Sequence, residues 1–445
     1  MHDPIDHKLA IAVAEGGRLR ALVLELWQRT RIDWGFVTDR LAITFRREKW
    51  VGAHERRFVS ETLYGIIRNL RRIDLAIMRG VHAARGANES SRGAGSPRDL
   101  ERLIAWLVLD GLLDAERARR TLGDLDWTAV ASVDDAIRGE RDVVTRIALS
   151  ASLPDWLAAR LYADWGEAAE ALALALNQRA PMTVRANTLV TDRAALATEL
   201  ESVQLATHAG AWSDTAMIVD TRTNLFALDA FQRGAFEVQD EGSQLLAELA
   251  IPTTQKPLIV DYCAGAGGKT LAIAARLGNR GRIVATDVDA TKLEELRKRA
   301  RRAKVSNARA MLVDDRELDP LRGKADVVLV DAPCTGIGAL RRNPEARWRF
   351  REDEIAGFAK RQLDIVAAAT KLLAPDGRLV YATCSLLAAE NAAVVAALPA
   401  ELAPVPLSQV LGAERAAALG DGTALVVSPH RHGTDGFFAQ VLRRA

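Results

Sequence analysis

Residues 261–270 read Asp-Tyr-Cys-Ala-Gly-Ala-Gly-Gly-Lys-Thr, and they lie between an apolar, β-branched run at 257–261 and a helical pattern at 268–277. Glycine lets the backbone turn tightly and approach a ligand closely, so such a turn is typical of folds that bind nucleotide-like cofactors. A phosphate-binding P-loop would need glycine at position 263, which is cysteine. A dinucleotide fingerprint would need Gly or Ala at position 270, which is threonine. The loop therefore predicts a nucleotide-like cofactor of another class.

Strand and helix patterns alternate along the rest of the chain after residue 236. This alternation predicts right-handed crossovers and a mostly parallel sheet with helices on both faces. The last two strand patterns are only about ten residues apart, which allows a final antiparallel hairpin. We expect an α/β, Rossmann-type fold with seven strands, and the strand patterns lie at 257–261, 282–287, 309–313, 326–331, 378–383, 423–428 and 437–442.

An acidic residue four positions before a Gly-x-Gly sequence, as Asp261 stands before Gly265, resembles the loop of Rossmann-type methyltransferases that use S-adenosylmethionine. The resemblance implies that Asp287, which ends the second strand, accepts hydrogen bonds from the ribose hydroxyls, and that Asp314 lies near the adenine. In the simpler alternative the glycines only form a tight turn and Asp287 only caps a helix. The predicted cofactor-binding residues are Cys263, Ala264, Gly265, Ala266, Gly267, Gly268, Lys269, Asp287, Asp314 and Asp331.

Two of the three cysteines end neighbouring predicted strands, Cys334 in Asp331-Ala332-Pro333-Cys334 and Cys384 in Thr383-Cys384-Ser385. Ligands of open parallel sheets bind outside the carboxyl ends of the strands, so both thiols are expected on the cofactor's side. A lone cysteine in such a place is usually a small buried apolar residue. A pair beside Asp331 favours a chemical role instead.

Taken together, these motifs resemble the RsmB/Sun family of RNA 5-methylcytosine methyltransferases, in its bacterial 16S rRNA form. The likeness covers about residues 150–442. The family loop commonly reads Cys-Ala-Ala-Pro-Gly-Gly-Lys, and this chain departs from it with Gly265-Ala266-Gly267 in the middle. Further matching segments are 185–187, 238–244, 341–345, Trp348, 379–385 and Glu390-Asn391.

The resemblance implies a division of roles among four residues, Cys384, Cys334, Asp331 and Lys269. Cys384 would add as a thiolate to C6 of cytosine, which makes C5 able to accept a methyl group. Cys334 would assist proton removal or product release, and Asp331 would hydrogen-bond the base. Lys269 would supply the positive potential that favours a thiolate.

A cluster of arginines with an aromatic residue follows the Asp331–Cys334 motif. Cations can contact phosphates and an aromatic ring can stack on an unpaired base. In the alternative, Trp348 packs in a core and the arginines are solvated. A second basic run, at 297–304, favours an exposed helix face. The predicted RNA-binding residues are Arg185, Arg341, Arg342, Arg347 and Trp348.

Three domains are expected. Residues 1–145 predict an all-helical domain, because segments 8–28 and 55–80 carry apolar residues at three- and four-residue spacing. Within this domain, the segment 62–74 resembles, more weakly, the NusB-like RNA-binding domain of the bacterial 16S rRNA members. The alternative, a helical domain with a purely structural role, remains open. Residues 146–235 predict a small α+β subdomain that binds RNA, and 236–445 the methyltransferase domain.

Composition excludes several other classes. The chain has 445 residues, 49% hydrophobic and 27% charged, with a net charge of +2, which neither requires nor forbids a nucleic-acid partner. Its longest stretch without Asp, Glu, Lys or Arg has 12 residues, fewer than the roughly 18–20 of a membrane-spanning helix. Residues 1–7 are acidic where a secretory signal would be basic and then apolar, so we expect no such signal. Three cysteines cannot form a disulfide framework. We expect a cytoplasmic monomer without a bound metal.

Two alternatives to an rRNA methyltransferase remain at this point. The first keeps the chemistry and changes the substrate to tRNA. The second is a catalytically weak RNA-binding factor in ribosome assembly, against which the intact cysteine pair, Lys269 and Asp331 argue. A DNA cytosine methyltransferase would explain Cys334 but not Thr383-Cys384-Ser385.

Overall fold

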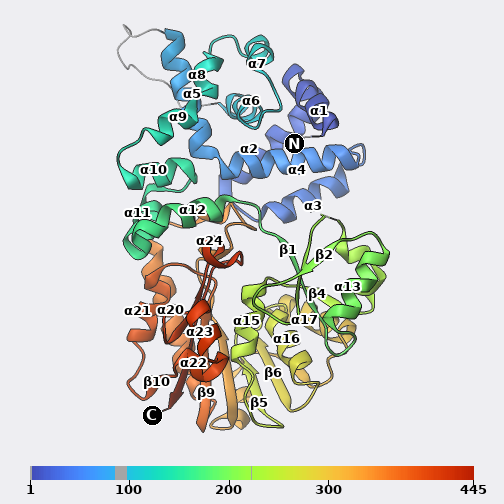
Figure 1. Cartoon of the computed structure of the whole chain (residues 1–445), viewed down its shortest axis with the longest axis vertical. Coiled ribbons are helices and arrows are strands. Elements are labelled where there is room, and N and C mark those ends of the chain that lie inside the picture. Colours follow the sequence, from blue (N-terminus) through green and yellow to red (C-terminus); the bar gives the residue numbers. More distant parts are fainter. Residues whose placement is uncertain (1–2, 86–97, 222, 445) are drawn as a thin grey trace. The chain divides into compact units, whose positions relative to one another are not determined.

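The computed structural model describes residues 3–85, 98–221 and 223–444, which divide into two compact units. The helical unit contains Met1–Gln178 and Leu340–Glu352, and the sheet unit contains Arg179–Ala339 and Asp353–Ala445. Figure 1 shows the elements of both units, coloured along the chain. Among the described residues, no helix is both long enough and apolar enough to cross a membrane.

Short helices around one apolar core form the helical unit. In α4, Val59, Leu63 and Ile66 recur at four- and three-residue spacing and are fully buried. A Cβ atom at Gly65 would meet the Trp106 ring at 2.2 Å, so α4 and α6 pack in direct contact. The helices are α1 Pro4–Glu15, α2 Gly17–Asp33, α3 Val37–Arg47, α4 Ala53–Arg68, α5 Leu70–Arg85, α6 Asp99–Leu109, α7 Ala115–Thr121, α8 Trp127–Ala131, α9 Val133–Arg138, α10 Val143–Ser150, α11 Asp155–Trp165, α12 Ala169–Asn177 and α19 Ala346–Arg349.

Both long helical patterns of the N-terminal region are interrupted in the structure. The segment 8–28 is divided at Gly16 and Gly17, whose φ angles of 127° and 85° are outside the helical range. The segment 55–80 is divided at Asn69, whose side-chain amide donates to the Gly65 carbonyl at 3.0 Å. Apolar periodicity continues across both breaks, which is why it did not reveal them.

The division into units differs from the predicted boundaries 1–145, 146–235 and 236–445. Helices α10, α11 and α12 belong to the helical unit, with α10 packed against α5. The Arg71 guanidinium also donates to the Leu153 carbonyl at 2.9 Å. The segment Leu340–Glu352, which we placed in the methyltransferase domain, belongs to the helical unit as well.

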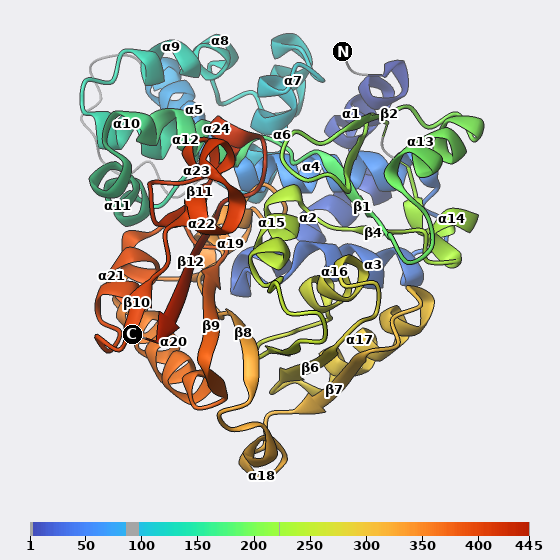
Figure 2. The ribbon, with the colours of Figure 1, turned by 60° about the horizontal axis from the view of Figure 1, so that its bottom comes forward.

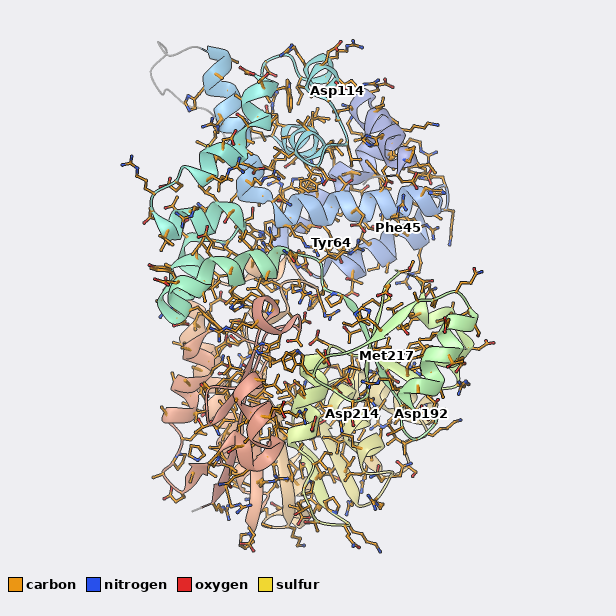
Figure 3. The ribbon with its side chains drawn as sticks, in the orientation of Figure 1. Phe45, Tyr64, Asp114, Asp192, Asp214 and Met217 are labelled. Atoms are coloured by element: carbon orange, nitrogen blue, oxygen red, sulfur yellow. The ribbon has the colours of Figure 1, made fainter. Side chains whose placement is uncertain are left out.

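A small antiparallel sheet with the strand order β2–β3–β1–β4 opens the sheet unit. Met217 on β3 lies in its apolar core, and Asp192 caps α13 by accepting a hydrogen bond from the Ala195 amide at 2.8 Å (Figure 3). Its elements are β1 Met182–Ala186, α13 Arg193–Ser202, β2 Thr207–Ala209, β3 Ala216–Val219, α14 Asp229–Gln232 and β4 Phe236–Val238.

The large sheet has the strand order β10–β12–β9–β8–β5–β6–β7, with β11 paired to β12. Strands β5 to β9 run parallel, and β10, β11 and β12 are antiparallel. The predicted α/β fold and its final hairpin are thus confirmed. The sheet has eight strands and not seven, because the three residues of β10 form an edge strand too short for a sequence pattern. The strands are β5 Leu258–Asp261, β6 Arg282–Asp287, β7 Ala308–Leu312, β8 Ala325–Asp331, β9 Leu373–Thr383, β10 Leu402–Pro404, β11 Ala424–Val427 and β12 Phe437–Arg444.

Helices cover both faces of this sheet (Figure 2). One apolar cluster joins the strands to α15, α16, α22 and α23, and another joins them to α18, α20 and α21. Strand β5 pairs with β6 on one side and β8 on the other, so the strand order reverses at β5 and a crevice is expected at its carboxyl end. The helices are α15 Glu241–Leu249, α16 Gly268–Arg276, α17 Ala290–Arg302, α18 Asp315–Leu318, α20 Ile355–Thr370, α21 Ala392–Ala396, α22 Leu407–Leu411, α23 Ala413–Leu419 and α24 Pro429–His432.

Candidate active site

The glycine-rich loop joins β5 to α16 at the reversal of strand order, and its shape depends on two left-handed residues. Gly265 has a φ of 55°, and open space lies where its Cβ would be. Gly267 has a φ of 85° and caps α16, and a Cβ there would meet Leu296 at 2.5 Å. Gly267 is therefore required by packing, whereas Gly265 leaves room beside the backbone for a ligand.

Asp287 holds this loop against the end of β6. Its carboxylate accepts hydrogen bonds from the Gly265 amide and from the Asp289 amide, both at 2.9 Å. Asp314 lies one strand further out, after β7, with an exposed side chain that accepts from the Arg316 amide at 2.8 Å. Beside these acids stand two apolar side chains that our sequence analysis missed, Val288 (83% exposed) and Leu312 (48% exposed). An exposed apolar pair near two acids suits a ligand with a flat ring and hydroxyl groups.

A buried carboxylate opens the loop. Asp261 is 1% exposed, and the Thr270 hydroxyl donates to its Oδ2 at 2.6 Å. Its Oδ1 is buried without a hydrogen-bond partner among the described residues. Burial raises the pKa of Asp261 to about 6, although the Thr270 hydrogen bond and Lys269 oppose the shift.

The two strand-end cysteines meet, as their positions predicted. Strands β8 and β9 pair in parallel with Asp331 opposite Ala382, so the residues that follow them lie side by side. The Sγ atoms of Cys334 and Cys384 are 3.4 Å apart. Cys263 lies in the cofactor loop, where burial and the neighbouring carboxylates, Asp331 first, raise the pKa of its thiol.

A partly buried ion pair between Lys269 and Asp331 lies beside the cysteine pair. Burial alone would lower the pKa of Lys269, but the charge and hydrogen bond of Asp331 outweigh it, so the pKa is raised and the ammonium persists. The hydrogen bond with Cys384, followed by burial, raises the pKa of Cys334 well above its usual value. Cys384 also interacts electrostatically with Lys269, so the ammonium favours a negative charge on Cys384.

Most of the predicted RNA contacts lie in the interior. Arg185 is 2% exposed and its Nε donates to Gln239 Oε1 at 2.7 Å. Arg347 is 1% exposed and donates to the Ala151 carbonyl at 2.7 Å and to Asn177 Oδ1 at 2.8 Å. Burial lowers the pKa of Arg185 to about 10 and that of Arg347 to about 9.

In this conformation the buried guanidinium groups of Arg185 and Arg347 are not open to a phosphate, and contact of these two residues with RNA stays a prediction. Trp348 packs against the core of the helical unit, 5.8 Å from the Trp34 ring. Arg341 is 8% exposed, and Arg342 keeps a partly exposed side chain. The alternative for Trp348, packing in a core, is the one that the structure favours.

Two arginines of the basic run at 297–304, both on helix α17, form ion pairs inside the sheet unit. Arg299 and Arg302 both pair with Glu237 of β4, which is 2% exposed. Arg302 also stacks on the Phe231 ring at 3.8 Å. These contacts fasten the small sheet to the large one, so only the other cations of the helix are left for an exposed face.

One group near the cysteines was not assigned a role by sequence reasoning. Glu390, Thr335, Ser385 and Gln362 form a buried hydrogen-bond network behind the two thiols. Glu390 was noted in the sequence only as part of a matching motif. The signal that could have found the network is the polar residue directly after each cysteine, Thr335 and Ser385.

Two family models match the chain. The model described as 16S rRNA methyltransferase RsmB/F matches residues 248–443, and the one described as the ferredoxin-like domain of RsmF/B-like methyltransferases matches residues 153–225. The first match contains the cofactor loop and both strand-end cysteines. The second contains most of the small sheet.

Similar proteins cover most of the chain. A ribosomal RNA small subunit methyltransferase B of Xylella fastidiosa (strain 9a5c) is 32% identical over 66% of this chain and 68% of its own length. A probable ribosomal RNA small subunit methyltransferase B of Synechocystis is 29% identical over 88% of this chain and 92% of its own. The crystal structure of a methyltransferase homolog protein from Pyrococcus horikoshii shares 26% identity and superposes with a TM-score of 0.58, over 68% of this chain and 99% of that one.

Proposed function

This chain belongs to the RsmB/F family of 16S rRNA methyltransferases, and from that membership we propose that it methylates carbon 5 of a cytosine in 16S rRNA through a covalent bond to Cys384. One observation carries the proposal: the two thiols of Cys334 and Cys384 lie 3.4 Å apart at the carboxyl ends of adjacent parallel strands. A single buried thiol would need no chemical explanation. Two thiols in contact beside a partly buried Lys269–Asp331 ion pair do need one.

The cofactor of the chain is S-adenosylmethionine, and the residues at the loop fit its parts. The unpartnered Oδ1 of Asp261 is an acceptor that the ammonium group of the cofactor would satisfy. The open space at Gly265 leaves room beside the backbone, and Asp287 can accept further hydrogen bonds from ribose hydroxyls. Val288 and Leu312 offer apolar surface for the adenine. When bound, S-adenosylmethionine supplies an electrophilic methyl group on its sulfonium.

Cys384 supplies the nucleophile. Its thiolate forms a bond to C6 of the cytosine, and the electron pair of the C5–C6 double bond moves so that C5 becomes nucleophilic. The base is otherwise a poor nucleophile at C5. Lys269 favours this step, because its ammonium lies close enough to interact with Cys384.

Asp331 holds the base during the addition. The carboxylate is fixed by Lys269 and lies at the end of the strand that carries Cys334. From there it accepts a hydrogen bond from the N4 amino group of cytosine and so holds the base in place for the addition. Lys269 therefore orients Asp331 and stabilises the nucleophile.

Cys334 assists the breakdown of the adduct. After the methyl group has been accepted, a water molecule takes the C5 proton, the electron pair of that C–H bond restores the C5–C6 double bond, and the C6–sulfur pair returns to Cys384. The raised pKa of Cys334 keeps this thiol protonated, so it can donate a hydrogen bond to the departing sulfur at 3.4 Å.

The test uses RNA from cells that lack this gene, the purified protein and methyl-labelled S-adenosylmethionine. We expect label in 5-methylcytidine within the small-subunit rRNA. The Cys384→Ala variant is expected to lose methylation by more than about a hundredfold, since no other group supplies the thiolate. The Cys334→Ala variant is expected to accumulate a denaturation-resistant protein–RNA adduct.

The double variant Cys334→Ala/Cys384→Ala is the control, because its adduct must disappear if Cys384 forms the bond. Label in the tRNA fraction would contradict the rRNA substrate. Label in another nucleoside, or an active Cys384→Ala variant, would contradict the covalent cytosine mechanism.

A further inference from the structure

A buried carboxylate lies between the two cysteine loops. Glu390 ends a short turn at Ala388–Glu390 and is fully buried. The Thr335 amide and the Gln362 side chain donate to its Oε1 at 2.9 and 3.1 Å. The hydroxyls of Thr335 and Ser385 donate to its Oε2, both at 2.6 Å.

The partners of Glu390 come from both sides of the reaction centre. Thr335 directly follows Cys334, and Ser385 directly follows Cys384. Gln362 of α20 also donates to the carbonyl of Pro333, the residue before Cys334, at 3.1 Å. A buried carboxylate is costly unless hydrogen bonds satisfy it, and here every partner is a neutral donor. Moving either loop would leave part of this charge unsatisfied.

We infer that Glu390 is a positioning residue, which holds the loops of Cys334 and Cys384 in one fixed register so that both thiols reach the same cytosine. The inference rests on the proposed function, in which one thiol forms the adduct and the other assists its release. In this proposal Glu390 acts on the thiols indirectly, through its hydrogen bonds with Thr335, Ser385 and Gln362.

Glu390 also bears on the difference between the two thiols. The titratable groups that act on the Cys334 side chain are Cys384 and Glu390, and Tyr381 packs near it. The hydrogen bond to Cys384 and burial contribute most to its raised pKa, and the charge of Glu390 adds to them. Loss of that charge is therefore expected to make Cys334 more reactive as well as less well placed.

The Glu390→Gln variant tests the inference, because it keeps the shape and removes the charge. Its amide also cannot accept all four donors. We expect kcat for methylation to fall by about 10- to 100-fold, with KM for S-adenosylmethionine unchanged. We expect Cys334 to react faster with iodoacetamide, with its pH midpoint moved to lower pH, when each cysteine is followed by mass spectrometry.

Glu241→Gln is the matched control, because Glu241 is also buried in the sheet unit (5% exposed) and accepts from the backbone amides of Trp212 and Ser213. It should leave the Cys334 midpoint unchanged. If Glu390→Gln does not fold by circular dichroism, Thr335→Val decides, since it removes one donor and should lower kcat in the same direction.

Values of kcat and of the Cys334 midpoint that match the wild type, in whichever of the two variants folds, would overturn the inference. The alkylation measurement needs no RNA, so it reports on Glu390 even if the wild-type protein yields no 5-methylcytidine. A wild-type protein that yields no 5-methylcytidine would contradict the proposed function and not the role of Glu390.

Discussion

At the scale of single residues, Asp261 shows how burial changes a side chain whose sequence context suggests only a loop acid. It follows three strand residues, and its carboxylate is enclosed with one oxygen bonded to Thr270 and the other without a hydrogen-bond partner among the described residues. The pKa of about 6 means that the folded protein holds this proton at pH values where an unfolded chain has lost it. Stability is then coupled to pH through this one group.

We expect Asp261→Asn to stabilise the cofactor-free sheet unit above pH 6. Burial on folding raises the pKa of Asp261 from its ordinary value of 3.8 to about 6. Its contribution to stability is therefore fully present below about pH 4 and is lost as the pH rises through 6. At pH 8 the variant should gain up to about 3 kcal/mol relative to the wild type, and at pH 4 the gain should vanish. Thermal melts of both proteins across this range measure the difference.

Asp192→Asn is the control for that series. Asp192 is exposed and caps α13, and asparagine caps helices about as well. The control should therefore show no comparable pH-dependent gain. A gain for Asp261→Asn that is constant from pH 4 to 8 would mean that the carboxylate is not protonated in the folded state.

At the scale of elements, the parallel pairing of β8 and β9 brings the two thiols together. The register places Asp331 opposite Ala382, and the Ala332 amide donates to the Ala382 carbonyl at 2.8 Å. The cysteines are 50 residues apart in the chain, yet each needs only two or three more residues beyond its paired strand end to reach the other. The pairing of β8 with β9 therefore decides the chemistry at the carboxyl ends of these strands.

The loop between β5 and α16 makes a prediction about two of its glycines. Gly265→Ala should fold but weaken binding of S-adenosylmethionine by about tenfold or more, because the new methyl group would occupy open space that the backbone leaves for a ligand. Gly267→Ala should destabilise the sheet unit by about 1–3 kcal/mol, because its methyl group would clash with Leu296 in a left-handed conformation. Calorimetric titration with the cofactor and thermal melts give the two quantities.

Gly278→Ala is the matched control for Gly265→Ala. Gly278 has a φ of 57°, close to the 55° of Gly265, and open space at its Cβ, but it lies beyond the far end of α16. Both variants carry the same backbone strain, so only the cofactor affinity should distinguish them. Equal affinities would show that the space at Gly265 does not face the cofactor.

At the scale of the whole molecule, the chain returns to the helical unit in the middle of the sheet unit. The segment Leu340–Glu352 follows the Cys334 motif and packs among the first helices, with Trp348 against the core around Trp27. Arg347 donates to backbone and side-chain oxygens of the α10 and α12 regions. A basic aromatic segment that resembles an RNA-binding strip is in this protein a structural part of the helical unit.

We expect Arg347→Ala to destabilise the helical unit by about 2–4 kcal/mol, because the Ala151 carbonyl and Asn177 would lose their buried donor. RNA binding should keep the salt dependence of the wild type, since no phosphate contact is removed. Hydrogen exchange of α10 and α12 and binding titrations at several salt concentrations measure the two effects. Arg301→Ala, a change at an exposed arginine of α17, should not affect the stability of the helical unit.

A salt dependence that falls by about one ion for Arg347→Ala, with unchanged hydrogen exchange, would contradict the buried position. It would support the predicted contact of Arg347 with RNA. The same experiment on Arg342→Ala examines the predicted contact whose side chain remains partly exposed.

The amino-acid sequence by itself determined the features that depend on neighbours along the chain. The loop at 261–270, the alternation of strand and helix, and the two cysteines at strand ends are local patterns, and the topology rules then place them at one edge of the sheet. The ends of the individual helices in the helical region could not be predicted as well, because the apolar periodicity continues across breaks such as Gly16 and Gly17.

Only the tertiary structure decided which charged residues are buried and what they contact. Arg347 lies against Ala151, 196 residues away, and the partners of the Glu390 side chain come from two loops and from α20, up to 55 residues away in the chain. The periodicity of apolar residues carries no information about contacts between such distant segments. The sequence around an arginine is also the same whether its guanidinium faces water or a buried carbonyl. The physical reason is that burial belongs to the packed assembly of many segments, whereas a motif belongs to one.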